Sequence, residues 1–454
     1  MAMGTRDERQ QGMWIATTTL ARSPGHPFYQ ALNRLLSKHG FDAFVQERCR
    51  GFYSEIGRPS LAPAVYFRML LIGYFEGIDS ERGIAWRVAD SMTLREFLGY
   101  ELSEATPDHS TISRNRRLLS LEVHQEVFGW IVALLAKEGL LKGKTLGIDA
   151  TTLEANAAMR SIVRRETGES YREFLTQLAE ASGIETPTRD DLARLDKKRK
   201  GKGSNDDWTH PHDPDARITK MKDGRTHLAH KAEHAVDLET GAVVGVTVQP
   251  ADRGDTQSVE ETIDEALETL AVVLADEEAA RALGDSLMEE AVLDRGYHSG
   301  AVLEKAAQLG IRTYISEPNR GRRNWKDKAV QRALTYANRR RIRGDRGKQL
   351  AKLRAEKVER SNAHCYETGG MRRTHLRGHE NILKRLLVHV GGFDLGLVMY
   401  ALVGVGTPRG LQGLRRLVFD VISALSALVR RAWGALARIW KPTPFYLSGI
   451  GACP

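Results

Sequence analysis

The chain has 454 residues, a length that excludes one ordinary domain and predicts two or three. Its 67 Lys and Arg residues outnumber its 58 Asp and Glu residues, and the formal net charge of +9 favours a polyanionic partner. The three scattered cysteines argue against a disulfide framework or a zinc knuckle. The N-terminal residues contain no apolar signal core, so we expect a cytoplasmic protein.

The first 140 residues are expected to form an all-helical domain. Apolar residues recur at helical spacing in the stretches 26–50, 61–78, 80–89, 93–99 and 121–138. Before the last of these, Pro107 and Asp108 form a turn, and Ser110 or Thr111 can cap the helix that follows.

That capped helix carries a dense group of hydrogen-bond donors. Arg114, Asn115, Arg116 and Arg117 lie within about one turn of it. A helix-turn-helix of this kind can place such donors in a DNA groove or on phosphates, and this is the interpretation we favour. The alternative is a solvated basic helix face.

Two strand-borne aspartates are the main candidates for chemistry. Residues 144–157 read KTLGIDATTLEANA, so a short apolar run carries Asp149 at its end. Residues 289–298 read EEAVLDRGYH, with Asp294 between an apolar strand and a Gly turn. A carboxylate at the end of a buried strand is held rigidly while its oxygens face solvent or a metal; taken singly, each aspartate is equally well explained as a turn cap.

A long polar excursion, about 158–226, separates the first aspartate from the rest of its domain. It contains one expected helix at 170–182 and a Pro- and Asp-rich stretch at 208–220. His210, His212, Asp213 and Asp215 lie in that stretch, where a polar loop is a better interpretation than a metal site.

The remaining elements alternate between strands and helices. We expect a hairpin (227–237 with 242–249), an acidic amphipathic helix (257–282), the Asp294 strand, a helix (301–309) and a strand (311–317). Residues 320–385 contain 21 Lys or Arg against 6 Asp or Glu. Within them, the predicted helix 347–366 carries Glu356 and Glu359. Two apolar helices are expected in the tail, at 380–403 and 410–440.

Part of this tail approaches the length of a membrane span. The stretch 386–406 is mostly apolar, but His389, Asp394 and several glycines lie within it. We interpret it as a buried helix of a soluble protein rather than a transmembrane segment.

This element order predicts a mixed α/β domain of the ribonuclease-H-like fold. In that fold the central sheet brings both strand-end aspartates together, and a following helix supplies a third acid, here Glu356 or Glu359. Converging carboxylates repel one another unless cations neutralise them, and hard oxygen ligands suit Mg²⁺ or Mn²⁺. Two such ions would support an in-line displacement at phosphorus.

Several motifs carry a resemblance over most of the chain. They are GRPSLAPAVYFRMLLIGYFEGI (57–78), DHSTISRNR (108–116), GIDATTLEANAAMRSIVRR (147–165), VLDRGYHS (292–299) and VERSNAHCYETGGMRRTHLRGHENILKRLL (358–387). With them, the chain resembles bacterial insertion-sequence transposases of the DDE class, in the insertion-sequence-four/five supergroup and closest to its 1182-type branch.

The resemblance assigns residue roles. It implies that Asp149, Asp294 and Glu359 are the catalytic, metal-binding acids, which favours Glu359 over Glu356. It implies two Mg²⁺ or Mn²⁺ ions, cleavage at terminal inverted repeats, joining to target DNA, and a homo-oligomer assembled on DNA in the bacterial nucleoid. Candidate DNA contacts are the basic residues of the N-terminal helix and those near the acids: Arg114, Arg116, Arg117, Arg295, Arg322, Arg323, Lys352 and Arg360.

One part of the family pattern is not kept. Many relatives place Tyr, Arg and Lys at fixed positions around the glutamate, where this chain has Lys352, Ala355 and Tyr366. Trp208 and Trp325 are candidates for stacking on an unpaired base or for packing in a core.

We therefore expect three regions and one activity. The regions are a helical DNA-binding domain (1–140), a ribonuclease-H-like catalytic domain (141–400) and a helical tail (401–454). The activity is that of a transposase; the alternatives are an inactive or domesticated DNA-binding derivative and a structure-selective nuclease on the same fold.

Overall fold

The computed structural model describes residues 25–54, 56–57, 60–199, 203–221, 224–284, 287–319, 321 and 323–411. Contacts divide the chain after Gly406, and every element discussed below belongs to the first unit, Met1–Gly406. The predicted helix at 410–440 lies almost entirely outside the described residues.

The N-terminal region is helical, as predicted. Its helices are α1 (Pro27–Lys38), α2 (Phe41–Cys49), α3 (Pro63–Glu76), α4 (Glu81–Ala89), α5 (Met92–Phe97), α6 (His109–Leu118) and α7 (Leu121–Lys137). Asp108 caps α6 by accepting the Thr111 amide hydrogen, so the cap is the aspartate rather than Ser110 or Thr111.

A six-stranded mixed sheet forms the centre of the second region. Its strands are β1 (Thr145–Glu154), β4 (Arg217–Lys220), β5 (Thr226–Asp237), β6 (Val243–Pro250), β7 (Glu290–Leu293) and β8 (Arg312–Ile315). The order is β4-β5-β1-β7-β8, with β6 also paired to β5. β5 runs antiparallel to β1. β7 runs parallel to β1, and β8 runs parallel to β7. This mixed sheet, behind a helical region, is consistent with the predicted ribonuclease-H-like fold.

The first strand differs from its prediction. The sequence indicated a strand that ends at Asp149, but β1 continues to Glu154, because β5 pairs with it along Leu146–Glu154. Its parallel pairing with β7 stops at Ile148 and Leu293. At Asp149, β1 is therefore still paired with β5 but no longer with β7.

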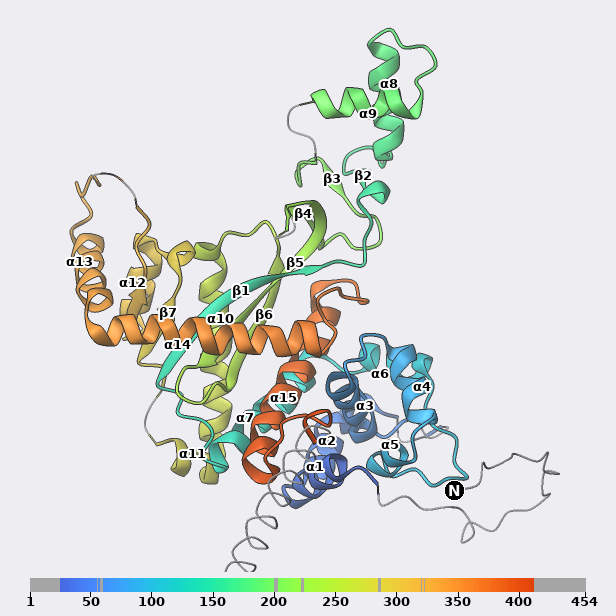
Figure 1. Cartoon of the computed structure of the whole chain (residues 1–454), viewed down its shortest axis with the longest axis vertical. Helices are drawn as coiled ribbons and strands as arrows, with labels where there is room; N and C mark the ends of the chain where they lie inside the picture. Colours follow the sequence, from blue (N-terminus) through green and yellow to red (C-terminus); the bar gives the residue numbers. More distant parts are fainter. Residues whose placement is uncertain are drawn as a thin grey trace, which may run out of the picture. The chain divides into compact units, whose positions relative to one another are not determined.

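Helices cover both faces of this sheet (Figure 1). Helix α10 (Asp255–Ala275) packs against β5 and β6, and α14 (Asp345–Asn362) crosses β1, β5, β7 and β8. The shorter α11 (Glu277–Leu283), α12 (Gly300–Gln308) and α13 (Ala329–Arg343) complete the layers. A π-helical turn, η5 (Ala363–Thr368), follows α14 where the sequence predicted continued α-helix.

The polar excursion contains more structure than the sequence indicated. It has the expected helix, α8 (Tyr171–Ala181), but also α9 (Arg189–Lys198) and a small hairpin, β2 (Val163–Arg164) with β3 (Trp208–Thr209). Leu175, Ala179 and Leu192 form an apolar cluster between the two helices. Both helices begin with reciprocal capping boxes, at Ser170 and Thr188, which compensate for their polar composition.

Helix α15 (His379–Val403) contains most of the apolar stretch that approaches membrane length. Within the described residues it meets a length and hydropathy test for a span, as does the α6–α7 pair, which is bent by 97°. The most apolar window of α15 is 72% buried inside the fold. It packs against α7, α3 and β6, which agrees with the buried-helix interpretation.

Candidate active site

Asp149 and Asp294 lie side by side at one edge of the sheet. Ile148 and Leu293 form the last register pair of the parallel strands β1 and β7. The next residue after each of them is an aspartate, so Asp149 and Asp294 are neighbours. Burial raises the pKa of the Asp149 carboxyl, and the nearby Asp294 charge adds a smaller contribution in the same direction. This is the juxtaposition that the strand pattern predicted.

Asp149 forms an ion pair with Arg354, which lies on helix α14. Arg354 of α14 donates from Nη1 to Asp149 Oδ2 at 2.6 Å, and the Ala150 amide donates to Oδ1 at 2.9 Å. Burial raises the pKa of the Asp149 carboxyl above its ordinary value, the neighbouring Asp294 acts in the same direction, and Arg354 and the Ala150 amide oppose it. The carboxylate is therefore costly to desolvate and is partly neutralised by Arg354.

Gly147 makes room for this ion pair. A Cβ at position 147 would lie 2.5 Å from Leu238 Cδ2 and 3.1 Å from Arg354 Cγ. The glycine two residues before Asp149 thus lets the methylene stem of Arg354 lie against β1 and reach the carboxylate.

Asp294 is held by a turn instead of a strand. Its Oδ1 accepts the Gly296 amide hydrogen at 2.7 Å and caps the short 3₁₀ helix η4 (Arg295–Tyr297). A Cβ at Gly296 would lie 2.3 Å from Asp255 Oδ2 and 3.1 Å from Asp294 Oδ1. The Asp255 carboxylate therefore flanks the same turn.

His234 lies beside Asp149 on the neighbouring strand. The two residues are register partners, and His234 contacts the Tyr366 hydroxyl through Nε2 at 2.6 Å and the Ser361 hydroxyl through Nδ1 at 3.1 Å. Complete burial lowers the pKa of His234 to about 3, so the ring is neutral at physiological pH. Tyr366 is also fully buried, so its side chain does not face solvent.

The third predicted acid does not join this pair. Glu359 and its competitor Glu356 both lie on α14 and are exposed. Val358 is buried against the sheet, and each residue turns about 100° from the last, so Glu359 points away from the buried stripe. Within the described residues, no group of three or more His, Cys, Asp or Glu side chains is arranged to hold a metal ion. The structure brings Asp149 and Asp294 together, and the assignment of Glu359 continues to rest on the VER motif.

The basic residues of α6 divide into two groups. Arg114 and Arg117 are exposed. Arg116 is turned inward, where it forms an ion pair with Glu81 and donates to Asn381 Oδ1. Asn115 is 2% exposed and accepts a hydrogen bond from the Tyr53 hydroxyl. The sequence could not separate these residues because all four fall within one turn.

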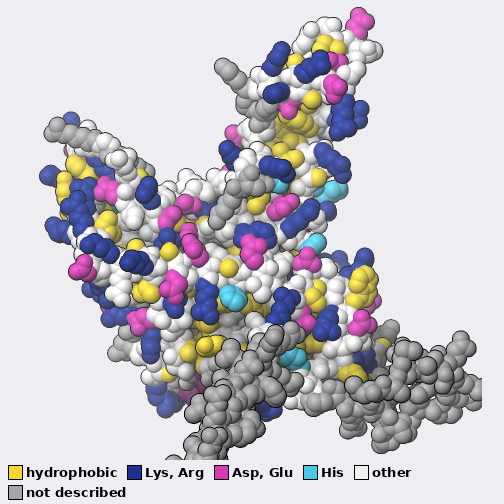
Figure 2. Space-filling view, in the orientation of Figure 1, with side chains coloured by type: hydrophobic (Ala, Val, Ile, Leu, Met, Phe, Trp, Pro, Cys, Tyr) yellow, Lys and Arg dark blue, Asp and Glu magenta, His cyan; other side chains and the backbone are white. Residues whose placement is uncertain are grey.

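The basic candidates near the acids are mostly on the surface. Arg295, Lys352 and Arg360 are exposed, whereas Arg323 forms an ion pair with Glu317 at 3.1 Å. Arg322 lies outside the described residues. Figure 2 shows Lys and Arg side chains gathered over α13 and α14, with acidic side chains among them.

Packing bears on the two tryptophans and on the 208–220 stretch. Trp208 is 3% exposed and contacts the rings of Tyr171 and Phe174 edge-on, so it belongs to the core of the insertion. Trp325 is half-buried beneath the Arg323 guanidinium. Asp213 and Asp215 accept the amide hydrogens of Gly378 and His379 at the start of α15. The loop prediction for 208–220 is right only for the middle of that stretch, because β3 and β4 occupy its two ends.

Several residues of the site were missed in the sequence. Arg354 is the clearest case, because the family comparison drew attention to position 355, one residue away. Lys231, Glu233 and Tyr297, described below, lie in stretches that read as ordinary strand and turn. For Lys231 and Glu233 the signal was charge within an apolar strand, HKAEHAVD (230–237), which is costly unless it is paired.

Two family matches agree with this geometry. Residues 19–118 match the family described as transposase domain (DUF772), and residues 203–390 match the transposase DDE domain. The second match contains Asp294 and Glu359, and Asp149 lies between the two. No curated protein and no solved structure matches the chain. The chain belongs to the DDE transposases of insertion sequences, enzymes that cleave and transfer DNA.

Proposed function

We propose that this transposase binds the terminal inverted repeats of its own insertion sequence and performs Mg²⁺-dependent cleavage and strand transfer by two-metal in-line displacement. The observation that carries the proposal is the pair of carboxylates, Asp149 and Asp294, that follows the last parallel register pair of β1 and β7. We place the chain in the 1182-type branch on the motifs quoted above.

The residues of the site suit a divalent cation. Two carboxylates repel each other at this edge, and Asp149 already attracts the Arg354 guanidinium. Their hard oxygen atoms are the donors that Mg²⁺ and Mn²⁺ prefer. When bound, the ions supply neutralisation of charge at phosphorus and a lowered pKa for the attacking hydroxyl or water. Glu359, on the same helix as Arg354, is our candidate for the third ligand on the strength of the VER motif.

Other residues of the chain prepare this chemistry. Arg354 neutralises Asp149 and holds its carboxylate in one orientation. Arg295 follows Asp294 directly and is exposed, so its guanidinium is available to a DNA phosphate. Lys352 and Arg360, exposed on α14, add positive charge near Glu359. His234, the register partner of Asp149, and its hydrogen-bond partner Tyr366 are both fully buried, so neither faces solvent beside the site.

DNA recognition is assigned to the helical region. Arg114 and Arg117 are exposed on the surface of α6, where phosphates can reach them. Arg116 instead holds α6 to α4 through Glu81. We expect the full chain to assemble as a homo-oligomer on its two ends.

A gel assay with labelled terminal repeats, a target plasmid and Mg²⁺ tests this function. We expect cleaved ends joined to the target. Asp149→Asn and Asp294→Asn should each reduce cleavage by about 1000-fold, because metal ligation supplies several kcal/mol of transition-state stabilisation. Both variants should still shift the labelled repeat. Cleavage without joining would favour the nuclease alternative, and a shift without cleavage would favour the inactive DNA-binding derivative.

A further inference from the structure

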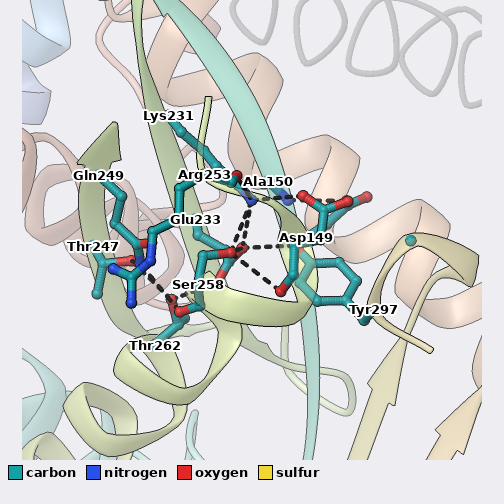
Figure 3. Close-up of polar contacts among 12 residues, drawn as sticks. Asp149, Ala150, Lys231, Glu233, Thr247, Gln249, Arg253, Ser258, Thr262 and Tyr297 are labelled. Carbon is teal, nitrogen blue, oxygen red and sulfur yellow. Dashed lines mark hydrogen bonds and ion pairs between the residues drawn. The ribbon is translucent and has the colours of Figure 1, made fainter. Parts of the chain in front are cut away.

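A buried charged side chain lies directly behind the two aspartates. Glu233, the register partner of Ala150, points to the α10 face of the sheet and is completely buried (Figure 3). Its Oε1 accepts hydrogen bonds from Ser258 Oγ at 2.8 Å and from Tyr297 Oη at 2.8 Å. Its Oε2 accepts one from Thr262 Oγ1 at 2.6 Å. A buried carboxylate is tolerated only with such partners, so this arrangement is specific and costly to disturb.

Lys231 links Glu233 to the start of α10. Its ammonium group is 3.6 Å from Glu233 Oε1 and donates to Asp255 Oδ1 at 2.6 Å. It also donates to Ser258 Oγ at 2.8 Å. Lys231 is 5% exposed, so it acts as a fixed charge between the strand and the helix.

Both ends of this network reach the turn that carries Asp294. Tyr297 is the last residue of η4, is 1% exposed, and donates its hydroxyl hydrogen to Glu233. Asp255 Oδ2 lies against Gly296, within 2.3 Å of where a Cβ at that position would be. Burial and the Glu233 charge raise the pKa of Tyr297 above its ordinary value, so its hydroxyl remains a donor.

We propose that Lys231, Glu233, Tyr297 and Asp255 are positioning residues that fix the η4 turn and thereby hold the Asp294 carboxylate beside Asp149. The inference rests on the proposed metal-dependent function and adds the residues that support one of its ligands. None of the four is needed to touch DNA or metal. Their role is needed because Asp294, unlike Asp149, has no strand pairing of its own to fix it.

The turn would otherwise be free to move. Beyond Leu293 the backbone leaves β7, and the Asp294 carboxylate caps the turn through a single hydrogen bond to Gly296. The Tyr297 hydroxyl ties this turn to β5, and Asp255, at the start of α10, lies against Gly296 and is itself held by Lys231. Outer residues that orient a ligand change metal affinity by about 10-fold or more when they are removed.

Tyr297→Phe tests the proposal by removing one hydroxyl and no packing volume. In the full-length protein, we expect Mn²⁺ binding, measured by calorimetry or by the paramagnetic resonance of free Mn²⁺, to weaken by about 10-fold. Asp294→Asn in parallel identifies the titrated site.

A second tyrosine provides a matched control. Tyr314 of β8 donates to the buried Glu290 at 3.1 Å, at the opposite end of β7 from Asp294. Tyr314→Phe should lower the melting temperature about as much as Tyr297→Phe but leave Mn²⁺ binding unchanged. Glu233→Gln, which keeps an acceptor oxygen for Tyr297, should bind Mn²⁺ within about 3-fold of the wild type.

Three results would overturn the inference. Undiminished Mn²⁺ binding by Tyr297→Phe, or an equal loss in Tyr314→Phe, would remove the positioning role while leaving the proposed function intact. A loss in Glu233→Gln as large as in Tyr297→Phe would show that charge and not position matters. If Asp294→Asn removed none of the Mn²⁺ binding seen in the wild type, or if the wild type bound no Mn²⁺, this inference and the metal-dependent function would both fail.

Discussion

The two aspartates occupy one edge of the sheet but are held in different ways. Asp149 lies within a ten-residue strand, and its charge is balanced from the α14 side by Arg354. Asp294 lies on a turn beyond its strand, and that turn is supported from the α10 side by buried hydrogen bonds. Backbone pairing fixes the first acid, and side-chain hydrogen bonds fix the second. Changes near Asp149 should therefore alter stability, whereas changes near Asp294 should alter metal binding.

The sharpest test compares two glycines: Gly147, which lies two residues before Asp149, and Gly296, which lies two residues after Asp294. Gly147→Ala places a methyl group 2.5 Å from Leu238 in a closely packed strand, and we expect the free energy of unfolding to fall by up to about 3 kcal/mol. In Gly296→Ala the clash is with Asp255 Oδ2, the end of a side chain that is 39% exposed and can swing away. Chemical denaturation of both variants should show the larger loss in Gly147→Ala, and equal losses would break the comparison.

Removing the counter-charge of Asp149 should have a somewhat smaller effect. Arg354→Gln leaves a largely buried carboxylate beside Asp294, and we expect the metal-free protein to lose about 2 kcal/mol of stability. Because a bound cation replaces the missing charge, Mg²⁺ should raise the melting temperature more in this variant than in the wild type.

Arg360→Gln is the matched control for that experiment. Arg360 lies on the same helix and is exposed, so its loss should leave both the stability and the Mg²⁺ response near the wild-type values. An Arg354→Gln variant that behaves like this control would show that the ion pair is not what balances Asp149.

The environment behind Asp149 also predicts a dependence on pH. The pKa of His234 is about 3 in the folded state and about 6.5 in the unfolded chain, so the unfolded chain binds more protons below pH 6.5. The stability that neutral His234 contributes is present above pH 6.5 and is lost as the pH falls, by about 1.5 kcal/mol between pH 6.5 and 5. His234→Asn should flatten this part of the stability curve; an unchanged slope would contradict the buried, neutral ring.

The smallest effect is expected for substitutions in helix α6, which we expect to bind DNA and not to take part in cleavage. Arg114→Ala and Arg117→Ala should each lower the salt dependence of DNA binding by about one phosphate contact. Arg116→Ala should keep that salt dependence but reduce stability, because it breaks the ion pair with Glu81. Equal salt slopes in all three variants would indicate that α6 does not contact DNA.

The sequence predicted the strands that carry Asp149 and Asp294, and the ribonuclease-H-like fold led us to expect both at one sheet edge. The parallel pairing of β1 with β7 brings them together there, and their roles in catalysis stay predictions. The length of β1 was underestimated, since pairing with β5 overrides the polar composition of residues 150–154.

The helix-borne half was less predictable. Which face α14 presents to the sheet depends on long-range packing of residues such as Val358 and Ser361, so Glu359 and Arg354 could not be told apart as neighbours of Asp149. The same reason applies to α6, where only the contacts of Arg116 and Asn115 distinguish inward from outward donors. The core of the 158–226 insertion was equally hard to predict. It depends on Trp208 packing against Tyr171 and Phe174, which lie 34 or more residues earlier in the chain.

The proposed chemistry requires that Asp149 and Asp294 share one divalent-cation site. Iron-mediated hydroxyl-radical cleavage tests it most directly, because Fe²⁺ bound in place of Mg²⁺ cuts the backbone next to its ligands. We expect cuts near residues 149 and 294 at the same Fe²⁺ concentration, both suppressed by excess Mg²⁺ and by either Asp149→Asn or Asp294→Asn. Cuts near only one of the two aspartates, or cuts that neither substitution removes, would contradict the shared site.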